Sequence, residues 1–183
     1  AAAALAAPDG AAAIAEATVE TLRVASGATV DFGLGSHAAP DAPAPSVAAS
    51  REPADLARYR DPYSHACRAQ SIAVLAAGPP DPDADAGAAA HAAGLPGFAG
   101  LGCGDDCLPA LTSRLGMADL RPDLPDVQRP QLLVASPPAD AARYAVVAGL
   151  ARTRWLDAGR ADALYEMLAA TLQHDAAALV SRA

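Results

Sequence analysis

The chain has 183 residues, of which 52% are hydrophobic, and a formal net charge of −8 at pH 7. It contains no lysine and no asparagine. Their absence excludes a Walker-type phosphate loop, a protein-kinase site, a Schiff-base enzyme and N-glycosylation, because each of these requires one of the two side chains. The acidic balance argues against nucleic acid and anionic membranes as partners.

The first predicted element is an amphipathic helix that follows Asp9 and ends at Gly27. The face predicted to lie on the core consists of Ile14, Thr18, Thr21, Leu22 and Ala25. The face predicted to lie in solvent consists of Glu16, Glu20 and Arg23. Residues 1–8 are expected to form an arm and residues 36–50, rich in Pro and Ala, a surface linker. The whole chain, residues 1–183, is expected to form a single helical domain that includes these two segments.

The middle of the chain is predicted to hold several short helices. One begins at residues 52–53, breaks at residues 61–62 and resumes to Gly78. A Pro/Asp-rich loop follows, and then an alanine helix over residues 84–93. A glycine-rich loop leads into a further helix over residues 105–115, with Gly116 as its end.

The C-terminal part is predicted to form a helical hairpin. After a proline-rich crossing over residues 121–130 and an apolar run over 131–136, Tyr144, Val147 and Trp155 fall at helical spacing. A second helical pattern follows Gly159. The fold class predicted from these patterns is all-α, an irregular bundle of about five to seven helices with long Pro/Gly-rich crossings. The alternative is an α/β fold in which residues 131–136 form a short buried strand.

One polar cluster suggests acid/base chemistry. Asp61, His65 and Arg68 would share one face of the predicted second helix, with Ile72 and Leu75 continuing that face into apolar territory. His65 would be the acid/base group, Asp61 would orient it, and Arg68 would hold an anionic substrate group. The simpler interpretation is an ion pair at the start of a helix with a capped histidine.

A second cluster suggests a ligand or partner pocket, formed by Tyr63, Arg143, Tyr144 and Trp155. The aromatic rings would contact an apolar molecule and the guanidinium would hold an anionic group. No cofactor and no metal site are predicted, because no His or Glu pair has the spacing of a helical metal motif.

The cysteines are expected to be reduced. Cys67, Cys103 and Cys107 are an odd number and too few for a disulfide framework, and the spacing of the last two differs from C-x-x-C. This favours a cytoplasmic location.

The composition is typical of a G+C-rich bacterial genome. The function predicted for the chain is a subunit or small-molecule-binding module of a larger system, such as one of specialised metabolism. One alternative is a cofactor-independent enzyme that uses the Asp61, His65 and Arg68 cluster. The other is a purely structural subunit. A homo-oligomer or a partner protein is expected, because alanine faces bury little area on their own. A small anionic or apolar ligand fits the predicted pocket.

Overall fold

A three-stranded parallel sheet, in the order β3-β4-β5, lies at the centre of the fold. The structure is a computed structural model and describes residues 14–30, 50–61, 70–76, 78–79, 87–104, 106–148, 150, 153–160, 162, 165 and 169. The strands are β3 (Ser71–Leu75), β4 (Gln131–Ser136) and β5 (Thr153–Asp157). Along the register Ile72 lies opposite Leu132, and Val134 lies opposite Trp155.

The burial pattern explains why these segments are strands. In β4 every residue from Leu132 to Ser136 is buried, as expected for a central parallel strand that is covered on both faces. In β3 Ile72 and Val74 are buried, whereas Ser71 and Ala73 are exposed. That alternation has the period of two that places successive side chains on opposite faces of a sheet.

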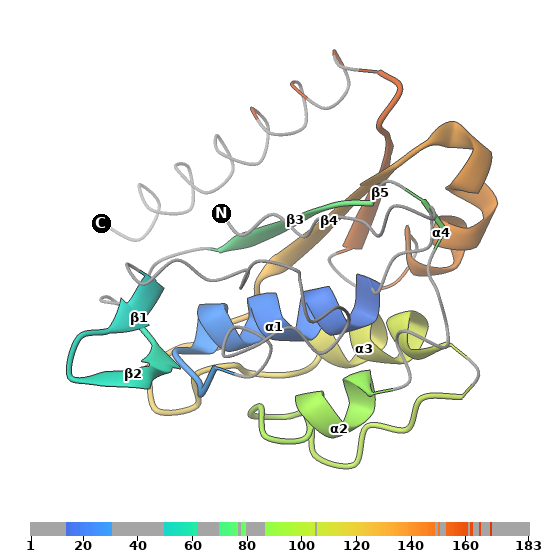
Figure 1. Cartoon of the computed structure of the whole chain (residues 1–183). Coiled ribbons are helices and arrows are strands. Elements are labelled where there is room, and N and C mark those ends of the chain that lie inside the picture. The colour runs from blue at the N-terminus through green and yellow to red at the C-terminus, as the bar shows by residue number, and fades with distance from the viewer. Residues whose placement is uncertain are drawn as a thin grey trace, which may run out of the picture.

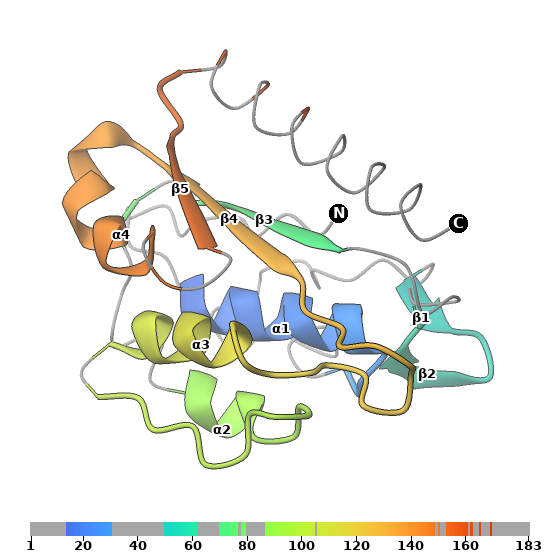
Figure 2. The same cartoon turned by 180° about the vertical axis from the view of Figure 1, so that it is seen from behind.

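Helices connect the parallel strands and cover the sheet. Parallel neighbours require a crossover, which α2 (Ala88–Ala92) and α3 (Cys107–Leu115) provide between β3 and β4. The 3₁₀-helix η3 (Pro138–Asp140) and α4 (Ala141–Ala148) lie between β4 and β5. Figures 1 and 2 show α1 (Ile14–Ser26) and α3 on the same side of the sheet, with α2 farther from the strands.

The core lies between the helices and one face of the sheet. Its members come from α1, α2, α3, α4, β3 and β4, from the turn after α2, and from the loop after α3. The large ones are Ile14, Val19, Leu22, Ile72, Val74, Leu95, Phe98, Leu108, Leu111, Leu115, Leu120, Leu132, Val134, Tyr144 and Val147.

A small antiparallel hairpin packs beside the end of α1. It consists of β1 (Arg51–Glu52) and β2 (Asp55–Tyr59), and the main-chain nitrogen of Val30 donates to the carbonyl of Ala57 at 2.7 Å. The chain leaves α1 through Gly27, whose φ of +63° favours glycine. A Cβ there would also lie 3.3 Å from the Cα of Asp61, so a side chain would require the chain at Asp61 to shift by a few tenths of an ångström.

The all-α prediction is wrong, and the alternative with a buried strand at residues 131–136 matches the structure. The helix predicted from residue 52 is the β1–β2 hairpin, and its continuation beyond residue 70 is β3. The helix predicted to carry Tyr144 and Trp155 ends as α4 at Ala148, and Trp155 lies in β5. Parallel pairing with β4, which also buries Thr153, outweighs the helical spacing there.

The helices predicted at the N-terminus, around residue 90 and before Gly116 are confirmed as α1, α2 and α3. The solvent face predicted for α1 is wrong, because Glu20 and Arg23 are each 8% exposed. The Tyr59 hydroxyl donates to Glu20, and Arg23 donates to the carbonyls of Thr29 and His91. The hairpin and α2 therefore cover this face, and the hydrogen bonds offset the cost of burying charge. Residues 1–8 and 36–49 lie outside the described residues.

Candidate functional site

Asp61, the first residue of the predicted catalytic cluster, belongs to an ion-pair network. It follows β2 rather than lying on a helix, and its Oδ1 lies 2.6 Å from Nη1 of Arg121. His65, Arg68 and Tyr63 lie outside the described residues. The structure thus brings Asp61 together with an arginine 60 positions farther along the chain, a partner that local spacing does not suggest.

Arg121 holds a second carboxylate at the same time. Its Nε and Nη2 donate to the two oxygens of Asp123, both at 2.8 Å. This bidentate hydrogen bond lowers the pKa of the Asp123 carboxyl from 3.8 to about 2. The hydrogen bonds to Asp123 and Asp61 raise the pKa of the Arg121 guanidinium. The network ties the end of the hairpin to the loop after α3, which is a structural role.

The predicted pocket residues on α4 and β5 use their polar atoms inside the protein. Tyr144 is fully buried, and its hydroxyl donates to the carbonyl of Gly78 at 2.9 Å. Trp155 packs partly buried against the core, and its indole Nε1 donates to Oγ of Ser136 at 2.8 Å. Arg143 is exposed on α4. Tyr144 and Trp155 therefore help to hold α4, β4 and β5 together.

A hollow of about 360 Å³ lies where α3 ends, and we call it the Arg114 hollow. Its walls come from the turn after α2, from the last turn of α3 and from the loop that follows. The lining residues are Pro96, Gly97, Arg114, Met117, Ala118, Asp119 and Pro122. Ligand pockets commonly measure about 300–1,000 Å³, so the volume lies in that range, and the hollow is open to solvent because Gly97, Met117 and Pro122 in its lining are exposed.

Local hydrogen bonds shape one wall of the Arg114 hollow. The main-chain nitrogens of Met117 and Ala118 both donate to the carbonyl of Arg114, at 3.0 and 2.8 Å. Oδ1 of Asp119 accepts from the nitrogens of Arg121 and Gln128, at 3.1 and 2.9 Å. One carboxylate therefore anchors the loop in two places, and the Met117 side chain is left 64% exposed.

Glycine allows the opposite wall to approach. Gly97 has a φ of +79°, and a Cβ at this position would lie 2.9 Å from the Cβ of Ala118. Both the backbone conformation and the close contact therefore require glycine. The turn after α2 and the loop after α3 meet at this contact.

Two guanidinium groups lie at the Arg114 hollow or next to it. Among the described residues, none forms an ion pair with Arg114 or with Arg129. Nη2 of Arg129 donates to the carbonyl of Met117 at 3.2 Å, and its buried Nε has no hydrogen-bond partner in the described part of the chain. Asp119 is the one acidic residue in the lining. The lining therefore carries one positive and one negative side chain, and the Arg129 guanidinium donates to the carbonyl of a lining residue.

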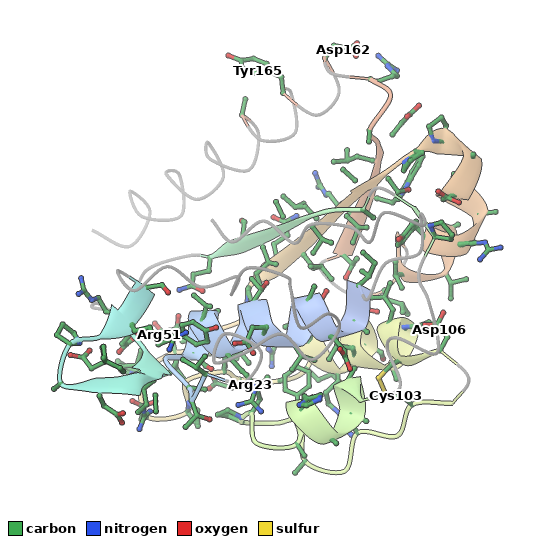
Figure 3. The ribbon with its side chains drawn as sticks, viewed as in Figure 1. Arg23, Arg51, Cys103, Asp106, Asp162 and Tyr165 are labelled. Atoms are coloured by element: carbon green, nitrogen blue, oxygen red, sulfur yellow. A yellow bond between two sulfur atoms is a disulfide. The ribbon has the colours of Figure 1, made fainter. Side chains whose placement is uncertain are left out.

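A disulfide holds the other end of α3. Cys103 is bonded to Cys107, the first residue of the helix, and Figure 3 shows the bond close to Asp106. The Asp106 side chain caps the helix by accepting from the nitrogen of Leu108 at 3.0 Å. The prediction that these two cysteines are reduced is wrong. Two cysteines four positions apart can form a disulfide when the second begins a helix and the first lies in a loop that turns back toward the helix. The spacing alone does not reveal this geometry.

Sequence reasoning missed the Arg114 hollow. An arginine in the last turn of a helix is common, because it interacts favourably with the helix dipole. The position of Arg114 in the sequence therefore did not indicate a binding site. The contact between Gly97 and Ala118 that closes the hollow joins residues 21 positions apart, and no local pattern predicts it.

Comparison of the sequence with models of protein families, with curated proteins and with solved structures found no match. Within the described part of the chain, no three His, Cys, Asp or Glu side chains are placed to share a metal ion. None of the helices described combines the length and the apolar character that a membrane crossing requires. Function is therefore inferred from the geometry of the Arg114 hollow.

Proposed function

We propose that the chain is a small-molecule-binding module and that its ligand lies in the Arg114 hollow. The observation that carries the proposal is a half-buried guanidinium without an ion-pair partner among the described residues, in a hollow otherwise lined mainly by apolar side chains. Binding sites commonly combine an apolar lining with a few placed polar groups. The hollow lies on loops that α3 positions, as binding residues often do.

The two methionines of the chain, Met117 and Met167, allow a direct test. Protein labelled with ¹³C at the methionine methyl groups should give two NMR signals, assigned with a Met117→Leu variant. A panel of small organic acids, alcohols and amines is then titrated. We expect at least one probe to shift the Met117 signal saturably, with Met167 as the reference for nonspecific effects.

A variant that fills the Arg114 hollow is the control. Pro122 is exposed and lines the hollow, so Pro122→Trp should remove the shift while the protein stays folded. If no probe moves the Met117 signal, or if Pro122→Trp leaves the shift intact, the Arg114 hollow is not the binding site.

Association with a partner or a second copy is the second candidate. Several large apolar side chains are more than half exposed, namely Leu56, Met117, Val127, Val146 and Tyr165. Contiguous patches of such side chains mark interaction surfaces, whereas single ones are common on any protein surface. A sedimentation coefficient that rises between 1 and 100 μM protein, taken here as roughly the range for weak self-association, would support a homo-oligomer.

The enzyme alternative stays a prediction, since His65 and Arg68 lie outside the described residues.

The Cys103–Cys107 disulfide supports an oxidising compartment in place of the predicted cytoplasm, because disulfides persist mainly where thiols are not kept reduced. Mass spectrometry after alkylation of protein taken directly from its source would decide this. If both cysteines carry carbamidomethyl groups without prior reduction, both are free thiols, and a reducing compartment is supported instead.

A further inference from the structure

We infer that the ligand of the Arg114 hollow is a small carboxylate with an apolar chain, an inference that rests on the binding function proposed above. The first reason is the state of Arg114. Two other described arginines are ion-paired, since Arg121 holds Asp61 and Asp123, and Arg160 holds Asp162. Among the described residues, Arg114 has neither an ion pair nor a side-chain hydrogen bond.

The second reason is the balance of charge around the hollow. Asp119 directs Oδ1 at two main-chain nitrogens, and Arg129 places a second guanidinium on the carbonyl of Met117. The lining thus holds one guanidinium and one carboxylate, and Oδ1 of that carboxylate already accepts from the backbone. An anionic group would be attracted here, whereas an amine would be repelled.

The third reason is the shape and chemistry of the remaining lining. Pro96, Met117, Ala118 and Pro122 offer carbon atoms to a ligand, so the anionic group must be attached to an apolar body. The planar fork of a guanidinium matches the two oxygens of a carboxylate. A volume of about 360 Å³ lies at the small end of the range for ligand pockets and suits an acid with a short chain.

Three probes with the same chain and different charge test this inference: hexanoate, 1-hexanol and hexylamine. Each is titrated into the full chain labelled at the methionine methyl groups, at low salt and pH 7. Hexanoate should saturate the shift of the Met117 signal at a concentration at least about tenfold lower than 1-hexanol does, because a charged hydrogen bond is added. Hexylamine should bind no better than the alcohol.

Variants assign the preference to Arg114. Arg114→Gln should reduce the affinity for hexanoate to that for 1-hexanol, and Arg114→Lys should keep part of the preference, since it retains charge without the fork. Arg143→Gln is the matched control, because it removes the same charge from an exposed site on α4. It should leave the preference for hexanoate unchanged.

The outcomes separate this inference from the binding function itself. If 1-hexanol binds as tightly as hexanoate, and if Arg114→Gln leaves the affinity for hexanoate unchanged, the hollow binds small molecules but the carboxylate inference is overturned. Preference for hexylamine would also overturn it and would point to Asp119 as the anchor. If no probe shifts Met117, the binding function fails as well.

Discussion

Removing the hydroxyl group of Tyr144 should destabilise the protein by about 1–3 kcal/mol. This hydroxyl is fully buried and donates to the carbonyl of Gly78 at 2.9 Å, joining α4 to the chain just after β3. Tyr144→Phe keeps the ring and its packing. It removes a hydrogen bond with a net contribution of about 1 kcal/mol and leaves a buried carbonyl with one partner fewer, which costs up to about 3 kcal/mol.

Urea unfolding measures this difference. With an m-value of about 2 kcal/mol/M, a loss of 2 kcal/mol lowers the unfolding midpoint by about 1 M at unchanged slope. The matched control is Tyr165→Phe, the same chemical change at a side chain that is 75% exposed and stands at the surface in Figure 3. That variant should stay within about 0.5 kcal/mol of the unaltered protein.

The difference in stability between the Tyr144→Phe and Tyr165→Phe variants shows whether the hydrogen bond to Gly78 stabilises the fold. If Tyr144→Phe is as stable as Tyr165→Phe, the hydrogen bond to Gly78 does not stabilise the fold, and α4 is held by apolar packing alone. If the slope m also changes, the variant has altered the compactness of one of the two states, and the midpoint cannot be converted into a contribution of the hydroxyl.

Three further predictions concern α3 and the loops beside it. Replacing Cys103 and Cys107 by serine should lower the free energy of unfolding by about 2 kcal/mol, the chain-entropy value for so short a loop; urea unfolding with and without a dithiol reductant checks this, and reductant should have no effect on the variant. The Asp123 carboxyl stabilises the fold while it is ionised, because its pKa is lowered from 3.8 to about 2; this contribution is present above pH 3.8 and is lost as the pH falls through about 2. Asp123→Asn should therefore flatten the pH dependence of the urea midpoint in that window, and a curve parallel to that of the unaltered chain would contradict the assignment. Gly97→Ala should cost more than Gly100→Ala in thermal unfolding, because both glycines have positive φ but only the first would place a Cβ 2.9 Å from a neighbouring side chain; equal losses would mean that the contact adapts freely.

The helices were easier to predict than the strands because their patterns are longer. In α3 a run of nine residues ends at Gly116 and begins beside a capping carboxylate, so local signals mark both ends. By contrast β3 has five residues. Ile72 and Leu75 match a helical spacing there, while Ile72 and Val74 match the spacing of a strand. Five positions are too few to distinguish the two periods, and the neighbour that decides, β4, lies about 60 positions away.

The segment from Tyr144 to Trp155 shows how tertiary pairing can override a good helical pattern. The spacing of its large side chains suits one long helix, yet the chain forms α4 and then β5. Gly149 weakens a helix by about 1 kcal/mol, while pairing β5 with β4 satisfies backbone groups and lets Trp155 donate to Ser136. The glycine is the one local hint of this break, and its effect is small compared with that of the pairing.

The position of the Arg114 hollow follows from what α3 does elsewhere. Leu108, Leu111 and Leu115 are buried on one side of the helix, which fixes its rotation, and the disulfide and the Asp106 cap fix its beginning. With rotation and start both fixed, Arg114 is turned away from the leucine face and toward the loop. A fixed backbone at Arg114 lowers the conformational entropy that is lost when an anion binds, although the side chain still has to be ordered. The direction in which Arg114 leaves the helix is therefore a consequence of the core packing of α3, and we expect the core residues of this helix to support the proposed binding function without contacting a ligand.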